Sequence, residues 1–247
     1  MATVREHYAL HLAPLYLWMA GGIEHALRLG TLDVASLGVP ARPGDLAVDL
    51  GAGFGMHAIP LARMGYSVIA IDTSPELIDE LGMHARGLQI RPIVADLADF
   101  RMHVPGLATL VLCMGDTLTH LESRDVVVRL FADIAAGLVP GGRFVATFRD
   151  YTALPAGEAR FIPVRSDDAR IQTCFLEDGG DTVLVHDVVH ERAGETWTMK
   201  VSAYPKLRLD PAWVLQTLQR NGFEAVRDAG PRGMVRITAT RARTPTV

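Results

Sequence analysis

A glycine-rich loop at residues 48–55 is the first part of the chain whose residue types and spacing could do chemistry. Gly51, Gly53 and Gly55 alternate there, directly after an apolar run that contains Asp49. Residues 56–64 can then form a helix. Glycines let the backbone approach a ligand closely, and the first N–H groups of a helix are unpaired, so this arrangement suits a polar, nucleotide-bearing ligand. Glycine turns also serve as structural connections, and the loop alone leaves that alternative open.

The glycine spacing separates two classes of nucleotide site. The dinucleotide fingerprint has a glycine at its sixth position, where this chain has Met56, which disfavours an NAD-linked oxidoreductase. An acid shortly before a G-x-G-x-G turn resembles motif I of the class I S-adenosylmethionine-dependent methyltransferases. The resemblance implies S-adenosyl-L-methionine as the cofactor.

Two further acids follow expected strand ends. Asp72 ends the second strand, where a carboxylate can accept hydrogen bonds from both hydroxyls of a ribose. Asp96 follows the third strand, where it could accept from the exocyclic amine of adenine, with Leu97 against the ring. The alternatives are a helix N-cap before Pro75 for Asp72 and a loop turn for Asp96. The loop and the two acids occur in the same order as in the methyltransferase family.

The segment after the fourth strand narrows the resemblance. Residues 111–121 read VLCMGDTLTHL, residues 147–151 read TFRDY and residues 201–205 read VSAYP. All three are similar to stretches of the glycine N-methyltransferases, and the match runs discontinuously over residues 46–215. It implies that Arg149 grips a substrate carboxylate, that Tyr204 contacts the substrate and that His120 lies near the cofactor. Asp116 stands where that family has an asparagine. An ionised carboxylate only accepts hydrogen bonds, so Asp116 favours an amine or hydroxyl and puts glycine itself in doubt as the substrate.

Each of these residues also has a structural interpretation. Arg149 could pair with Asp150 or Asp116, and Tyr204 could be a core aromatic. His120 could cap a helix that begins near residue 123.

An N-terminal stripe is the last candidate. Tyr8, Leu12, Tyr16 and Met19 fall near helical spacing, with Trp18 beside them. Such a stripe is usually core packing. In the resembled family, however, N-terminal aromatics close over the cofactor, which implies a lid that uses Tyr16 and Trp18.

The expected site is therefore as follows. The cofactor-binding residues are Tyr16, Trp18, Asp49, Gly51, Ala52, Gly53, Gly55, Asp72, Thr73, Asp96, Leu97 and Met114. The catalytic residues are Asp116, His120 and Tyr204, and the substrate-binding residues are Arg149, Tyr204 and Asp116. His186 and His190 share one face of an expected strand without a third ligand, so no metal site is expected.

The elements that must position these residues alternate between strands and helices. Strands are expected at residues 46–50, 67–71, 90–95, 107–113 and 143–148, and helices at 56–64, 75–84 and 124–137. Three β-rich runs follow at 171–176, 182–190 and 196–204, then a helix between Asp210 and Gly222 and a strand pair at 223–227 and 234–240. The fold class is α/β: a Rossmann-like, doubly wound, mostly parallel sheet with an antiparallel β insertion after the fifth strand and an N-terminal helical lid.

A single methyltransferase domain over residues 1–247 accommodates all of these elements. Its parts are an N-terminal helical segment (1–45), a cofactor-binding core (46–150), the β insertion (151–209) and a closing helix with a strand pair (210–247).

Composition limits the partners. The net charge is −4 and the lysines and arginines form no block, which disfavours nucleic acid. The apolar run at 12–23 is too short for a membrane span. The two cysteines form no disulfide framework, which favours the cytoplasm. A homodimer through the β insertion or the N-terminal segment is compatible with the sequence.

The expected function is methyl transfer from S-adenosyl-L-methionine to a small molecule, with an amine nitrogen as the preferred acceptor. A small-molecule O-methyltransferase and a non-catalytic protein that binds S-adenosylmethionine or a nucleoside are the alternatives. The polar residues at the fourth and fifth strand ends favour an enzyme, because a sensor needs no acceptor pocket.

Overall fold

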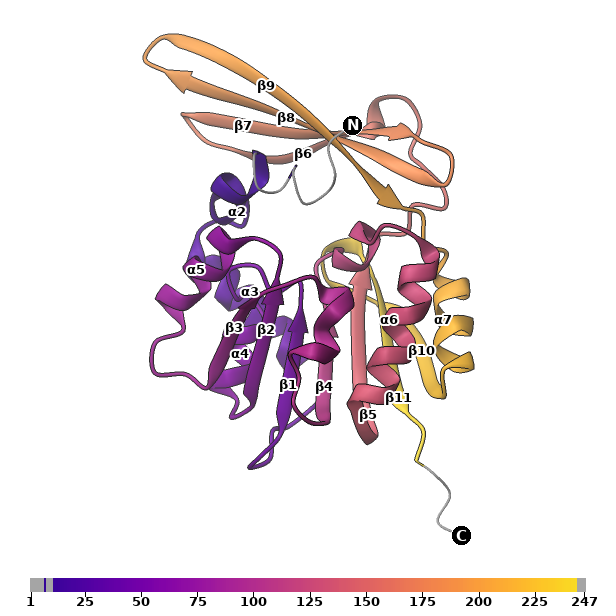
Figure 1. Ribbon diagram of the computed structural model, residues 1–247. Coiled ribbons are helices and arrows are strands. Elements are labelled where there is room, and N and C mark those ends of the chain that lie inside the picture. The colour runs from indigo at the N-terminus through magenta and orange to yellow at the C-terminus, as the bar shows by residue number, and fades with distance from the viewer. Residues whose placement is uncertain (1–6, 8–10, 244–247) are drawn as a thin grey trace.

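A computed structural model of the protein describes residue 7 and residues 11–243. The chain forms two sheets, one of seven strands in the order β10-β11-β5-β4-β1-β2-β3 and one of four strands in the order β6-β7-β8-β9. Figure 1 shows the smaller sheet lying across one edge of the larger one, with a short helix, α2 (Ala13–Met19), between them. Tyr8 lies outside the described residues.

The core of the larger sheet is parallel. Its strands are β1 (Leu46–Leu50), β2 (Ser67–Asp72), β3 (Ile90–Val94), β4 (Ala108–Cys113) and β5 (Leu138–Phe148). Neighbours from β3 to β5 run parallel, while β11 (Val235–Arg241) runs antiparallel to β5 and pairs with β10 (Phe223–Ala229). The closing strand pair predicted from the sequence therefore extends the main sheet at one edge.

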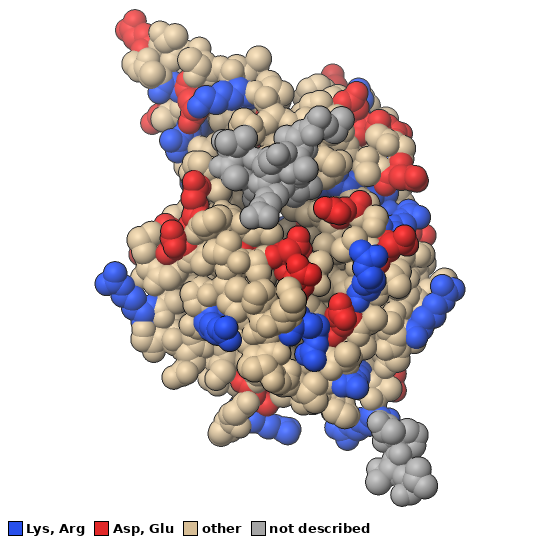
Figure 2. All heavy atoms as spheres, viewed as in Figure 1, with Lys and Arg blue, Asp and Glu red and all other residues tan. Residues whose placement is uncertain are grey.

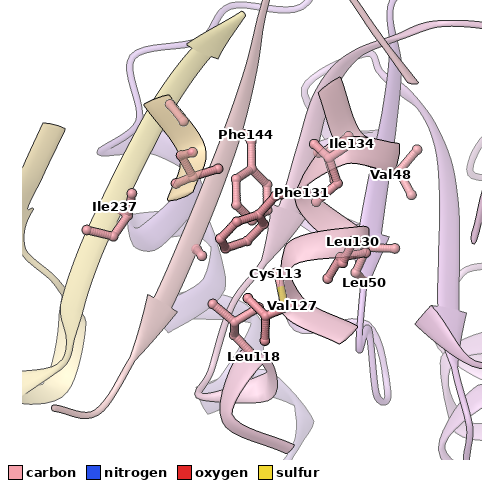
Figure 3. Packing of buried hydrophobic residues seen from close by; sticks show 14 of the residues in the cluster. Val48, Leu50, Cys113, Leu118, Val127, Leu130, Phe131, Ile134, Phe144 and Ile237 are labelled. Carbon is pink, nitrogen blue, oxygen red and sulfur yellow. The ribbon is translucent and has the colours of Figure 1, made fainter. Parts of the chain in front are cut away.

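Helices cover both faces of this sheet, as a doubly wound fold requires. One face carries α3 (Ile23–Ala35), α4 (Ala58–Arg63) and α5 (Pro75–His84), and the other carries α6 (Arg124–Gly137) and α7 (Pro211–Arg220). Figure 3 shows α6 packed on the sheet through four apolar side chains, Val127, Leu130, Phe131 and Ile134. They meet strand residues at Val48, Leu50, Cys113, Phe144 and Ile237, all of them buried. The predicted α/β fold is confirmed.

The smaller sheet is antiparallel and contains one strand more than the sequence indicated. Its strands are β6 (Phe161–Ser166), β7 (Arg170–Asp178), β8 (Thr182–Ala193) and β9 (Thr196–Leu207). Along β8 the buried side chains alternate with partly exposed ones, so one face of the sheet is turned inward. The missed strand, β6, is an edge strand interrupted by Pro163, which weakened its β pattern.

Many strand ends differ from the predicted ones by one to three residues, and three further differences concern the start of a helix, the start of a strand and the number of N-terminal helices. The helix expected at residues 56–64 begins only at Ala58, because residues 53–57 form the turns of the glycine loop. The strand expected from residue 143 begins at Leu138, and its register with β4 is irregular there. Within residues 11–45, the N-terminal segment contains two α-helices, α2 and α3, separated by Gly21 and Gly22, both with positive φ.

On the face seen in Figure 2, acidic and basic side chains are interspersed. Within the described residues, no helix is both long enough and apolar enough to cross a membrane.

Candidate cofactor and acceptor site

The carboxyl ends of β1, β2 and β4 meet at the edge of the main sheet that faces the smaller sheet (Figure 1). The glycine loop follows β1, and a 3-10 turn at Thr117–His120 follows β4. In parallel α/β sheets this edge is where ligands bind. The structure brings most of the predicted site residues to it.

The three glycines of the loop have different reasons to be glycine. Gly51 has φ +74°, and a Cβ added there would lie 2.3 Å from Cγ2 of Thr117. Gly55 has φ +93°, and its Cβ would lie 3.0 Å from the Leu81 side chain. Gly53 has φ +52°, and the nearest atoms to its Cβ, on Leu77 and Tyr16, are 3.9 Å away. Gly51 and Gly55 are thus required by packing, whereas a Cβ at Gly53 would only reach ordinary contact distance from Leu77 and Tyr16, and the positive φ there is what favours glycine.

Asp72 ties the second strand to the glycine loop. Its Oδ2 accepts a hydrogen bond from the Gly53 N–H at 2.8 Å, and its Oδ1 accepts from the Ser74 N–H at 2.9 Å. Burial raises the pKa of this carboxyl, although these N–H groups and that of Thr73 oppose the shift. The N-cap of α5 is Ser74, so the alternative that Asp72 caps this helix is wrong. Each carboxylate oxygen keeps a further lone pair for a ligand hydroxyl.

Asp49 is a buried acid below the loop. Its side chain is 1% exposed, and its Oδ2 accepts no hydrogen bond from the described residues. Burial raises the pKa of its carboxyl to about 6; the charge of His57 opposes that shift and the charge of Asp72 adds to it. Such a carboxylate is destabilising in the free protein and well suited to a cationic ligand.

Asp49→Asn should stabilise the ligand-free protein at neutral pH. The folded carboxyl keeps its proton up to about pH 6, so between the unfolded pKa and that value each rise in pH lowers the free energy of unfolding. We expect the variant to gain about 2 kcal/mol at about pH 8 and clearly less at about pH 5, measured by urea unfolding. Asp79→Asn, on the exposed side of α5, is the control. An equal effect at both pH values would contradict this assignment.

Asp96 and two apolar neighbours have structural roles. Asp96 caps the 3-10 helix Leu97–Met102, its Oδ1 accepting from the Ala98 N–H at 2.8 Å, so the turn interpretation is confirmed. Leu97 is partly buried against the main core, and Met114 is buried under the opposite face of the sheet. Asp96 is exposed, and its second oxygen is accessible to a ligand.

The two aromatics of α2 point to different places. Tyr16 lies against the glycine loop, with its ring centroid 5.9 Å from that of Phe54. Trp18 instead contacts the turn between β6 and β7: its indole N–H donates to Asp167, and Arg165 and Arg170 lie over its ring at 5.7 and 5.9 Å. Tyr16 is therefore placed to cover a cofactor, while Trp18 holds α2 to the smaller sheet.

Asp116 is surrounded by donors from the chain itself. Its backbone has φ +77°, its Oδ1 accepts from the Arg149 backbone N–H at 2.8 Å, and its Oδ2 accepts from Lys206 Nζ at 2.6 Å and from Tyr151 Oη at 3.2 Å. Burial would raise the pKa of its carboxyl, yet the Lys206 charge holds it below its usual value. The amine partner expected for Asp116 is thus Lys206.

Sequence reasoning missed Lys206. Its position in the strand could have revealed it. Lys206 lies two residues after Tyr204, and side chains two residues apart on a strand point to the same face of the sheet. Burial disfavours a charged lysine, but the nearby Asp116 raises the pKa of Lys206 above its ordinary value. The pair is a buried ion pair between the two sheets.

Arg149 presents its side chain to solvent at the end of β5. Among the described residues its guanidinium forms no ion pair, so the predicted alternative of a pair with Asp150 or Asp116 is wrong. A guanidinium left available at a ligand edge suits a carboxylate or phosphate.

His120 and Tyr204 meet in the buried layer between the sheets. Their ring centroids are 5.8 Å apart in an edge-to-face arrangement, and the His7 ring lies 4.2 Å from that of Tyr204. Burial and the Lys206 charge lower the pKa of His120 to about 3, so its ring is neutral at physiological pH. Ser123 caps α6, so the alternative that His120 caps this helix is wrong.

Together, the doubly wound sheet, the glycine turn and the carboxylate on the second strand define a protein with a nucleoside-type cofactor site next to an enclosed polar layer. A methyltransferase-domain family model matches residues 47–142. The match covers the glycine loop, Asp72 and Asp96.

Individual relatives agree with this match. The ubiquinone biosynthesis O-methyltransferase of Xanthomonas campestris pv. campestris is 33% identical over 130 residues, 51% of this chain and 52% of the relative. The glycine/sarcosine/dimethylglycine N-methyltransferase of Actinopolyspora halophila is 26% identical over 117 residues, 46% of this chain and 21% of the relative. The chain thus spans about half the length of the curated relatives it matches first.

The fold similarity extends over the whole chain. The structure of the CcbJ methyltransferase from Streptomyces caelestis aligns with a TM-score of 0.76 at 23% identity, covering 96% of this chain and 98% of that one. The chain therefore has the fold of this methyltransferase, and residues 47–142 match a methyltransferase domain. The predicted superfamily is confirmed.

Proposed function

We propose that the protein transfers a methyl group from S-adenosylmethionine to an amine nitrogen of a small molecule. The observation that carries the proposal is the junction of two sites at one sheet edge. The glycine loop, tied through Gly53 to Asp72 and lying next to Tyr16, supplies the cofactor side, and the buried polar layer around Tyr204 supplies the acceptor side.

Two features of the structure fit this cofactor. The unsatisfied carboxylate oxygen of Asp49 suits a ligand with an ammonium and a sulfonium charge. Asp72 has lone pairs left for the two ribose hydroxyls, and Asp96 has an exposed oxygen for an adenine amine. When bound, the cofactor supplies an electrophilic methyl group on sulfur.

The chain's own residues would then bind the acceptor, orient it and remove solvent water from around it. The smaller sheet and α2 lie across the carboxyl ends of β1, β2 and β4 (Figure 1), so an acceptor bound between the two sheets would be shielded from water. Tyr204 offers an aromatic face, Arg149 offers a guanidinium at the rim, and neutral His120 can accept a hydrogen bond from the acceptor N–H. Catalysis rests mainly on holding the acceptor lone pair in line with the methyl group.

The bases available in the site favour nitrogen over oxygen as the atom that accepts the methyl group. An amine can lose its proton to water before it binds, whereas a hydroxyl needs a base in the site. Asp116 is held ionised by Lys206, and His120 has a pKa lowered to about 3, so both are weak bases. The name of the Actinopolyspora halophila relative agrees with nitrogen, and that of the Xanthomonas campestris relative with oxygen. O-methylation is therefore the second candidate.

The decisive experiment pairs cofactor binding with acceptor chemistry. Thermal shift with S-adenosylmethionine, its demethylated product and NAD should give stabilisation by the first two only. Labelled S-adenosylmethionine is then incubated with a metabolite extract, and the methylated species are identified. N-methylated products support the proposal, O-methylated products support the second candidate, and cofactor binding without any transfer would indicate a non-catalytic binding protein.

Arg149→Gln should weaken the binding of only those acceptors that carry a carboxylate group. A guanidinium binds a carboxylate through two charge-assisted hydrogen bonds, so KM for an amino acid acceptor should rise about tenfold. KM for the corresponding amine without the carboxylate should not change. Arg63→Gln, at the C-terminal end of α4, is the matched control. Equal effects on both acceptors would remove the carboxylate role.

We extend the proposal to two broader properties. Cys113 is buried and both cysteines are free thiols, which supports a cytoplasmic location. A homodimer through the smaller sheet is supported by exposed apolar side chains on its outer side, at Ile171, Trp197, Met199 and Val201. Gel filtration with light scattering would test the dimer.

A further inference from the structure

Asp187 is a buried acid that the proposed reaction does not use. It lies on the inner face of β8, is 2% exposed and accepts three hydrogen bonds. Gln172 Nε2 and Cys174 Sγ both reach its Oδ1 at 3.0 Å, and His7 Nε2 reaches its Oδ2 at 3.0 Å. Burial opposes ionisation, but these partners hold the pKa of the carboxyl below its ordinary value. Asp187 is thus an ionised group in a nearly dry environment.

The counter-charge of Asp187 differs from that of the other acids on this face. Asp116 has Lys206 beside it, and Glu191 has Lys200 at 2.8 Å and Arg170 at 3.3 Å. Among the described residues in hydrogen-bond contact with Asp187, only His7 can carry a positive charge. That imidazole comes from the N-terminal segment and not from the sheet. A buried carboxylate whose partner is an imidazole would be stabilised more by a group that always carries a positive charge, such as an ammonium.

The surroundings of Asp187 suit an ammonium group. The Tyr204 ring lies 4.2 Å from the His7 ring, so an aromatic face borders the place that the imidazole occupies. Aromatic faces attract cations, and a carboxylate with an aromatic ring is a typical ammonium-binding combination. Lys206 Nζ already lies 5.7 Å from the centroid of the same ring.

Space is also present at this position. A cavity of about 130 Å³ lies between the beginning of α2 and the inner face of β8 and β9, and Asp187 is part of its lining. The lining includes Leu12 at the N-cap of α2, Leu15 from α2, and Ser202, which is paired directly with Asp187 across the strands. The ion pair of Glu191 and Lys200 also lines it. Such a cavity can take the amine end of a small molecule.

We propose that Asp187 is the anionic anchor for an amine group of the acceptor, and that His7 holds this position in the ligand-free chain. The inference rests on the proposed function and specifies its substrate class: a small molecule that carries an aliphatic ammonium group in addition to the neutral nitrogen that receives the methyl. Binding of a protonated amine replaces the His7 imidazole on Oδ2, while Gln172 and Cys174 keep their bonds to Oδ1. The bound ammonium then supplies a positive charge beside Asp187.

Methylamine and methanol are probes that separate charge from size. The experiment titrates each into the full chain, saturated with demethylated cofactor product, at neutral pH. The side-chain amide resonance of Gln172 reports on the carboxylate. We expect methylamine to shift this resonance and methanol to leave it unchanged. In Asp187→Asn the apparent affinity for methylamine should fall at least about tenfold.

A second variant keeps the test decisive if Asp187→Asn does not fold. His7→Gln leaves the carboxylate and removes the competing imidazole, so methylamine should bind a few-fold more tightly. Glu177→Gln is the matched control, because Glu177 forms a carboxylate–histidine pair with His186 at 2.8 Å at a partly exposed position of the same sheet. It should not change the response.

Three results would overturn the inference: no shift with methylamine, equal shifts with methanol, or weaker methylamine binding in His7→Gln. The last would mean that the His7–Asp187 pair only fastens the N-terminal segment. Failure of methyl transfer with an intact methylamine response would instead reject the proposed function and leave the amine site standing.

Discussion

Lys206→Met lowers the free energy of unfolding by about 3 to 5 kcal/mol, because it leaves the Asp116 carboxylate buried without a counter-charge. The Lys206 side chain is 10% exposed and that of Asp116 is 6% exposed, so water cannot replace the ammonium group. Urea unfolding followed by circular dichroism measures the change. Lys200→Met is the matched control: that lysine is 69% exposed in its pair with Glu191, and its loss should cost at most about 1 kcal/mol.

The double variant Asp116→Asn/Lys206→Met should recover at least half of the loss. Asparagine can accept the Arg149 N–H and tolerates the positive φ of position 116, and the double variant contains no unpaired charge. Two results would show that the pair does not hold the two sheets together. One is a free energy of unfolding of Lys206→Met within about 1 kcal/mol of the wild-type value. The other is a double variant that is less stable than Lys206→Met.

The contribution of this pair should be constant through neutral pH. The folded pKa of Asp116 is depressed, so its contribution is present above the unfolded pKa and is lost as pH falls through the folded value. The folded pKa of Lys206 is raised, so its contribution is present below the unfolded pKa and is lost as pH rises through the folded value. The stability difference between the wild type and Lys206→Met should therefore narrow only in acid and in strong alkali.

Asp72→Ala should weaken S-adenosylmethionine binding at least about 100-fold, to below detection in most calorimeters. The change removes two acceptor positions for ribose, each worth about 1.5 to 3 kcal/mol as a charge-assisted hydrogen bond. It also frees the Gly53 N–H, which orients the loop. Isothermal titration calorimetry with the cofactor and with its demethylated product measures the effect.

Asp79→Ala is the control for this variant, since Asp79 is an exposed acid on α5, the helix that follows Asp72. Asp72→Asn retains one oxygen for the backbone and should keep the fold while still losing most of the affinity. Unchanged affinity in a folded Asp72→Ala would remove the ribose assignment.

The cofactor half of the site could be predicted from local patterns. The glycine turn follows β1 as predicted, and Asp72 ends the second strand as predicted, where it accepts a hydrogen bond from the turn. Helix boundaries at Pro75–His84 and Arg124–Gly137 were predicted correctly, because N-capping serines at 74 and 123 act within a few residues.

The residues proposed for the acceptor site lie near one another, as the sequence indicated, but their pairing was not predicted. Asp116 was expected to face an acceptor, yet its partner is Lys206, 90 residues away. Trp18 was expected to lie over the cofactor, yet it contacts Asp167 across 149 residues. The alternation of side chains along a strand predicts which face a residue occupies, but it does not predict which residue of another element will contact it.

The sequence by itself determined the fold class, the glycine turn and the carboxylates of the cofactor site. These features depend on backbone conformation and on the period of apolar residues, both of which act over a few residues. Only the tertiary structure decided which charges meet between the two sheets: Lys206 with Asp116, and His7 with Asp187 across 180 residues. Such pairs form when elements far apart in the sequence pack together and bury their charged side chains in the same layer. Because an unpaired buried charge is costly in free energy, each charged group is then found beside a group of opposite charge.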